Sequence, residues 1–209
     1  MRRLVPGMVE SSRTLAPGIA IAIVRDCLAA LAALHRTQIV HGDIKPSNVM
    51  LKRTGNAKVV DVGSAFSMRE PPPRPICTPA YAAPEVIERN QETPQSDLAS
   101  VGYVLVEMLT GRPPFEGKTS FQDLLQAKRF FAQQLPHILP HEVVRNELLM
   151  EFCRRLVAPD PSRRFASAGE ADLDQVGAAA IQRQLVKGDL ASEYDNEIRL
   201  WLEALPELP

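Results

Sequence analysis

Residues 41–48 read His-Gly-Asp-Ile-Lys-Pro-Ser-Asn, and they combine an acid, a cation, an amide and a proline in one short segment. Such a segment is too short and too polar for a strand of the core. Pro46 excludes a helix through its middle and biases Lys45 toward extended geometry. Taken alone, these residues are as typical of a solvated surface turn as of a functional loop, so the motifs that follow decide between the two.

Further motifs follow in a fixed order. A short apolar run at 58–60 ends in Asp-Val-Gly (61–63), Thr-Pro-Ala-Tyr occupies 78–81, and Ala-Pro-Glu occupies 83–85. In order and spacing this series resembles the catalytic half of a eukaryotic-type, or Hanks-type, protein serine/threonine kinase, whose motifs are H-R-D-x-x-x-x-N, D-F-G and A-P-E. Lys45 has the spacing of serine/threonine kinases rather than that of tyrosine kinases.

The resemblance implies a mainly α fold: the α+β C-terminal lobe of a protein kinase, with a small β-hairpin at the catalytic cleft. It covers residues 1–180, and 181–209 form a C-terminal tail of unknown role. A complete kinase also has an N-terminal lobe with a glycine-rich loop, a strand lysine and a helix glutamate. No Gly-x-Gly-x-x-Gly precedes residue 41, and residues 1–7 resemble the strand and hinge that join the lobes. We therefore expect the chain to begin near the hinge and to lack the N-terminal lobe.

The resemblance also implies roles for residues of the cleft. Phosphoryl transfer requires mainly positioning and charge neutralisation. Asp43 matches the base that orients the attacking hydroxyl, and Lys45 matches the cation on the γ-phosphate of ATP. Asp61 and Asn48 match the ligands of Mg²⁺, which favours one or two carboxylates together with substrate oxygens. Met50 would lie beneath the adenine ring.

Further positions have implied structural roles. His41 opens the catalytic loop, Asp97 would brace the loop backbone, and Thr78 would contact the catalytic acid and lysine. Glu85 would form a buried ion pair with Arg164, for which Arg163 is the alternative partner.

Four positions depart from the family pattern. Gly42 replaces the arginine that reads a phosphate on the activation loop, and Val62 replaces the phenylalanine of the magnesium motif. Cys77 replaces a glycine, and Ala99 replaces a tryptophan. None of these changes removes a catalytic group.

Composition limits the class of protein. The 209 residues are 45% hydrophobic, enough for a core, and the net charge of −1 gives no reason to expect a nucleic acid or a membrane as partner. The 3 cysteines are far apart, which favours a reducing compartment. The apolar run at 18–24 is too short to span a bilayer. We expect a cytoplasmic protein.

Periodicity and turn residues predict the elements. Ser96-Asp97 should cap a helix that is apolar on all sides and ends at Gly111, which would make it the axis of the fold. The proline-rich segment 61–85 should contain no regular element. The remaining expected elements are a buried helix at 19–34, extended residues at 39–40, strands at 49–51 and 58–60 joined by a turn at 55–56, helices at 121–134 and 142–157 separated by a linker at 136–140, and a last helix from 167 to about 180.

The function implied is phosphorylation of protein serine or threonine, dependent on ATP and Mg²⁺, and weak or absent in this chain alone. A separate N-lobe or a regulatory partner would be needed besides the protein substrate. The alternatives are a catalytically dead, pseudokinase-like binding or scaffold module and a truncated product. Small-molecule phosphotransferases of the aminoglycoside or choline type share His-Gly-Asp followed by Asn, but they lack the segment that corresponds to 78–85.

Overall fold

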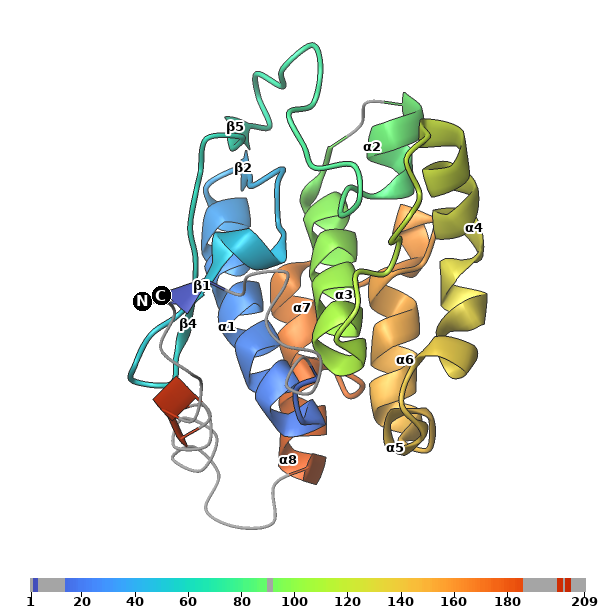
Figure 1. Ribbon diagram of the computed structural model, residues 1–209. Helices are drawn as coiled ribbons and strands as arrows, with labels where there is room; N and C mark the ends of the chain where they lie inside the picture. The colour runs from blue at the N-terminus through green and yellow to red at the C-terminus, as the bar shows by residue number, and fades with distance from the viewer. Residues whose placement is uncertain (1, 4–13, 90–91, 186–198, 201, 204–209) are drawn as a thin grey trace.

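The computed structural model describes residues 2–3, 14–89, 92–185, 199–200 and 202–203. The described strands all lie before residue 68 and the regular elements after them are helices, as expected for a mainly α kinase lobe (Figure 1). The helices are α1 (Pro17–Arg36), α2 (Pro84–Arg89), α3 (Pro94–Thr110), α4 (Phe121–Ile138), α5 (His141–Val144), α6 (Glu147–Leu156), α7 (Ala168–Leu173) and α8 (Ala178–Leu185), with 3-10 turns η1 (Pro46–Asn48) and η2 (Pro161–Arg163). The strands are β1 (Arg2–Arg3), β2 (Ile39–Val40), β3 (Val49–Leu51), β4 (Ala57–Val59) and β5 (Phe66–Ser67).

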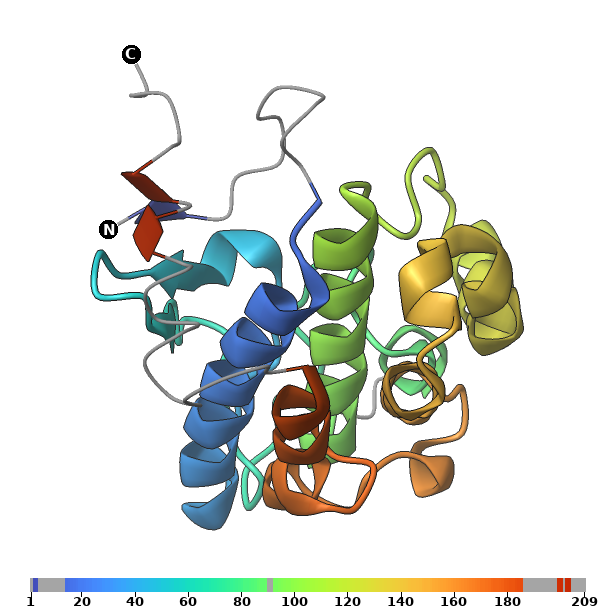
Figure 2. The ribbon, with the colours of Figure 1, turned by 90° about the horizontal axis from the view of Figure 1, so that it is seen from below.

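Helix α3 is the axis of the fold, as its sequence predicts. It is buried from Ser96 to Leu109 except at Glu107. It packs beside α1 on one side and α6 on the other (Figures 1 and 2). Gly102 permits the contact with α6, because a Cβ there would lie 2.7 Å from a methyl group of Val157. The helix ends at Gly111, whose φ of 70° is the left-handed conformation that glycine adopts without strain.

Helix α1 is the second core helix. Pro17 occupies its first turn, and its buried residues run from Gly18 to Leu31. By length and mean hydropathy of 1.8 this helix could cross a membrane, but half of its most apolar 18-residue stretch is buried inside the domain. Arg25 also pairs with Asp172 of α7 at 2.7 Å. These contacts are those of a core helix in a globular domain.

The strands form two small sheets. In the first, β3 lies between β1 and β4, and all pairs are antiparallel, with Met50 opposite Lys58. The β3–β4 pair is the expected hairpin, and Gly55 in its turn has a φ of 91°. In the second sheet β2 pairs with β5. The prediction that 61–85 holds no regular element was therefore wrong at Phe66–Ser67, because β2 supplies a partner strand that local sequence does not reveal. It was also wrong at the end of the segment, because α2 begins at Pro84, and a proline is tolerated in the first turn of a helix.

The start of helix α3 and the end of helix α4 also differ from the predicted boundaries. Helix α3 begins at Pro94, because Thr93 is the N-cap, and Ser96 forms the reciprocal half of a capping box from inside the helix. Helix α4 continues through Pro136 to Ile138 instead of ending at 134. A proline this close to the C-terminal end removes one backbone hydrogen bond of the helix and does not end it.

The helices predicted at 142–157 and 167–180 are each two helices. Asn146 separates α5 from α6, and its side chain accepts a hydrogen bond from the Leu149 amide as an N-cap. Gly177 lies between α7 and α8, where a Cβ would be 2.7 Å from the carbonyl oxygen of Asp172. Helices α7 and α8, on the two sides of Gly177, both pack against α1.

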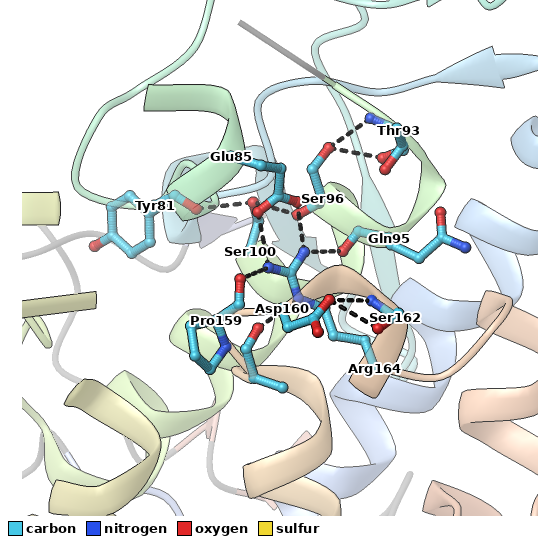
Figure 3. Close-up of polar contacts among 11 residues, drawn as sticks. Tyr81, Glu85, Thr93, Gln95, Ser96, Ser100, Pro159, Asp160, Ser162 and Arg164 are labelled. Carbon is cyan, nitrogen blue, oxygen red and sulfur yellow. Dashed lines mark hydrogen bonds and ion pairs between the residues drawn. The ribbon is translucent and has the colours of Figure 1, made fainter. Parts of the chain in front are cut away.

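A buried ion pair joins α2 to the segment before α7. The Arg164 guanidinium donates two hydrogen bonds to the Glu85 carboxylate, at 2.6 and 2.8 Å, and its side chain has no exposed surface (Figure 3). It also donates to the carbonyls of Ala158 and Gln95, at 2.8 and 2.9 Å. Because Arg164 makes both hydrogen bonds to Glu85 and Arg163 is exposed, the partner of Glu85 is Arg164 rather than the alternative, Arg163.

We predict that Arg164→Ala lowers the free energy of unfolding by about 3–5 kcal/mol, since it leaves the Glu85 carboxylate buried without its cation. Arg163→Ala is the matched control and should change stability little, because its side chain is exposed. Thermal and urea unfolding of both variants measures the difference. Equal, small losses would contradict the assigned pairing.

Candidate active site

Asp97 holds the catalytic loop from the first turn of α3. Its two carboxylate oxygens accept the backbone N–H groups of His41 and Gly42, each at 3.0 Å. His35, at the end of α1, contacts the same carboxylate through Nε2 at 2.8 Å. Asp97 is only 2% exposed, so the start of the loop, the end of α1 and the start of α3 meet at one buried acid. The structure thus places Asp97 against the loop backbone, and its bracing role stays a prediction.

Asp43, Lys45 and Thr78 form a closed polar cluster. The Lys45 amine lies 2.6 Å from Asp43 Oδ2 and donates to the Thr78 hydroxyl at 2.9 Å. The Thr78 amide donates to Asp43 Oδ1, also at 2.9 Å. Asn48 donates its side-chain N–H to the Asp43 carbonyl at 2.9 Å. The fold thus brings together a carboxylate with both oxygens oriented and a cation beside it, which can align a hydroxyl nucleophile.

The two predicted magnesium ligands, Asn48 and Asp61, lie on segments that are hydrogen-bonded to each other. Residue 60 donates its amide to the carbonyl of Asn48 at 2.9 Å, which places Asp61 next to the end of η1. Asp61 is exposed, and it is one of two described non-glycine residues with positive φ, at 66°. A strained backbone of this kind is common at functional sites. The hydrogen bond to Asp43 uses the amide nitrogen of Asn48, so the amide oxygen remains for a cation.

The donor set fits a magnesium ion that arrives with a nucleotide. Among the residues that the structure describes, no group of three or more His, Cys, Asp or Glu side chains could hold a metal by itself. One carboxylate and one amide oxygen suit Mg²⁺ when phosphate oxygens and water complete its shell. Met50 lies on β3 opposite Lys58 and is half-buried. Its predicted contact with adenine stays a prediction.

The segment 78–82 is fixed to α3 as well as to the catalytic loop. The Tyr81 hydroxyl donates to Glu107 at 2.5 Å, and the Ser100 hydroxyl donates to the Tyr81 carbonyl at 2.8 Å. Burial and the hydrogen bond to Glu107 raise the pKa of Tyr81, so this phenol stays protonated. Glu107 was not among the predicted site residues.

Gly42 faces an acid where the family has an arginine. A Cβ at Gly42, whose φ is 78°, would lie 3.1 Å from the Ser64 carbonyl and 3.4 Å from a carboxylate oxygen of Glu92. The other carboxylate oxygen of Glu92 is buried and has no hydrogen-bond partner among the described residues. Burial, with the nearby Asp97 and Asp43, raises the pKa of Glu92 to about 7. Burial, with the nearby Glu92 and Asp43, raises the pKa of Cys77 to about 11, so its thiol stays protonated at neutral pH.

We predict that Glu92→Gln stabilises the protein at pH 8 and has little effect at pH 5. The raised pKa means that the folded state holds more protons than the unfolded state between about pH 4.5 and 7, so wild-type stability falls as pH rises through this window. Glutamine stays neutral and escapes that loss. Melting temperatures at both pH values test it, with the exposed Glu116→Gln as control. The same shift at pH 5 and pH 8 would contradict it.

Comparison with known proteins agrees with this geometry. The protein kinase domain family matches residues 4–173, so the chain belongs to the Hanks-type protein kinase family. A probable serine/threonine-protein kinase of Streptomyces coelicolor is 32% identical over 91% of this chain. PknB, a serine/threonine-protein kinase of Mycobacterium tuberculosis, is 31% identical over 81% of it, and the Drosophila melanogaster serine/threonine-protein kinase PAK mbt is 32% identical over 70%. The chain spans 30%, 28% and 23% of these three relatives.

Sequence reasoning missed His35 and Glu92. His35 lies before the loop and looks like the C-terminal end of a helix, where a histidine is common. Glu92 lies in a short connection with no motif around it. The domain boundary predicted at residue 180 stays a prediction, and the tail from 186 to 198 lies outside the described residues.

Proposed function

We propose that this chain is the catalytic lobe of a protein serine/threonine kinase, which transfers the γ-phosphoryl group of ATP to a protein hydroxyl. The observation that supports the proposal is the cluster of Asp43, Lys45 and Thr78. The Thr78 amide donates to one Asp43 oxygen, and the Lys45 amine lies against the other. The Lys45 amine also donates to the Thr78 hydroxyl, which closes the cluster. A kinase needs this degree of positioning, because the protein contributes orientation and charge rather than covalent chemistry.

The residues would divide the work as follows. Asp43 accepts a hydrogen bond from the substrate hydroxyl and orients it, and Lys45 neutralises negative charge beside it. Asp61 and Asn48 would hold magnesium, which supplies charge neutralisation to the phosphates of ATP when it is bound. Asp97 keeps the loop backbone in place while Asp43 reacts. A cytoplasmic location belongs to the proposal too, and the free thiols of the three cysteines agree with it.

A binding or scaffold role is the second candidate. The 209 residues contain no glycine-rich phosphate loop before the catalytic loop. A protein kinase uses that loop, a strand lysine and a helix glutamate to bind ATP. Catalysis therefore requires these groups from elsewhere in a longer protein or from a partner.

The decisive experiment measures phosphoryl transfer to serine- and threonine-containing proteins by the full protein that contains this lobe. Asp43→Asn should reduce the rate by roughly 100-fold or more, the range expected for a lost general base. Asp61→Asn should raise the Mg²⁺ concentration needed for activity. Asp123→Asn, on the exposed surface of α4, is the matched control and should be neutral. Transfer that persists in Asp43→Asn, or no transfer by a folded wild type, would favour the scaffold role.

We also predict that Ser64 and Ser67 are not activating phosphosites. Gly42 has no guanidinium to pair with a phosphate, and the Ser64 carbonyl lies toward Gly42, where the nearest side chain is the acid Glu92. Ser64→Ala together with Ser67→Ala should keep full transferase activity. Loss of activity that aspartate substitutions restore would contradict the prediction.

A further inference from the structure

Lys128 on α4 is a buried lysine outside the predicted site. Its side chain has no exposed surface, although lysine is among the residues that are least often buried. The amine donates a hydrogen bond to the carbonyl of Ala80 at 2.8 Å. Ala80 lies between Thr78, which contacts Asp43, and Tyr81, which contacts Glu107. Lys128 therefore reaches the segment 78–82 from a helix that contributes nothing else to the catalytic cluster.

Two aromatic rings surround the amine. It lies 4.1 Å from the centre of the Tyr103 ring and 4.0 Å from the centre of the Phe115 ring. These rings pack with Phe131 of α4 in one cluster, with centroids 4.8 to 5.6 Å apart. The amine therefore lies over the faces of both rings, an arrangement that favours its protonated form and offsets part of the cost of burying it.

Burying the Lys128 amine costs free energy of folding, which argues that its hydrogen bond has a role. Burial lowers the pKa of Lys128 to about 6, and Cys77 and Glu85 offset this in part. A leucine or methionine would fill the same volume without that cost. What an apolar residue cannot supply is a donor for the Ala80 carbonyl, and the amine supplies it whether it is charged or neutral.

We propose that Lys128 is a positioning residue that holds the segment 78–82 against α4, and that it thereby keeps Thr78 in contact with Asp43 and Lys45. The first contact joins the Lys128 amine to the Ala80 carbonyl. Ala80 lies in a turn in which the Tyr81 and Ala82 amides donate to the Thr78 carbonyl, at 2.9 and 3.0 Å. The Thr78 amide in turn donates to Asp43. The part of this inference that concerns a protein substrate rests on the proposed kinase function.

Hydrogen–deuterium exchange of the 209-residue chain tests the positioning directly. Lys128→Met keeps the length of the side chain and removes the donor, and exchange of the Tyr81 and Ala82 amides should rise at least tenfold while α1 and α3 keep their protection. Gln133→Met, on the exposed side of α4, is the control and should leave this segment unchanged. Unchanged exchange at 81–82 in Lys128→Met would overturn the proposal, as would an equal rise throughout the chain, which would assign Lys128 to global stability.

Lys128→Arg keeps a donor that also stacks on rings, and it decides the matter if the methionine variant does not fold. Wild-type exchange at 81–82 in the arginine variant supports the proposal, and a loss of protection there at an unchanged melting temperature overturns it.

Kinetics of the full protein separate the inference from the proposed function. In Lys128→Met the KM for a serine peptide should rise or kcat should fall several-fold, while the KM for ATP stays the same. A local rise in exchange without detectable transfer by the wild type would support the positioning role and count against the kinase function. Transfer with an unchanged peptide KM and kcat in Lys128→Met would count against the positioning role alone.

Discussion

The catalytic loop depends on one buried carboxylate. Asp97 accepts hydrogen bonds from the amides of His41 and Gly42 and from the ring of His35. An acid on α3 therefore fixes the direction in which the chain leaves β2. Asp97 also lies in the first turn of α3, where the helix dipole favours a negative charge. The position of Asp43 follows from this anchor, because Asp43 directly follows Gly42, whose amide Asp97 holds. Helix α3, the axis of the fold, thus sets the geometry of the loop that carries Asp43.

Much of the fold could be predicted because its signals are local. Pro17 at the first turn of α1, the glycine turn of the β3–β4 hairpin and Gly111 at the end of α3 are read from a few residues each. The wrong boundaries have the opposite character. Gly177 was missed because the need for glycine comes from the close approach of the Asp172 carbonyl, which depends on how the chain turns between α7 and α8. Strand β5 was missed because its partner strand lies more than twenty residues away. Asn146 was readable as an N-cap, but the apolar pattern on both sides of it hid the break.

The site was predictable where the family motif names the residue and not where tertiary structure supplies it. The structure brings Asp43, Lys45 and Thr78 into contact, and Asp97 accepts a hydrogen bond from the amide of Gly42 just before Asp43. His35, Glu92 and Lys128 are ordinary by local sequence. Their importance comes from what surrounds them: a shared acid, an unpartnered oxygen and a pair of rings. Periodicity reports which face of a helix is buried, and it does not report what a buried polar group contacts.

The segment 78–82 is held by contacts that need no phosphate, and Gly42 offers no guanidinium to pair with one. Where an arginine reads a phosphate, the activation segment is held by a charge that can be added and removed. Here the segment is held by the Thr78 amide, the Tyr81 hydroxyl and the Ala80 carbonyl, none of which involves a phosphate. The partners of these groups come from the catalytic loop, from α3 and from α4, so three separate elements must be folded before the segment is placed. Order in the active site is therefore tied to folding of the lobe itself, and a substitution in α4 can disturb the catalytic acid without touching it.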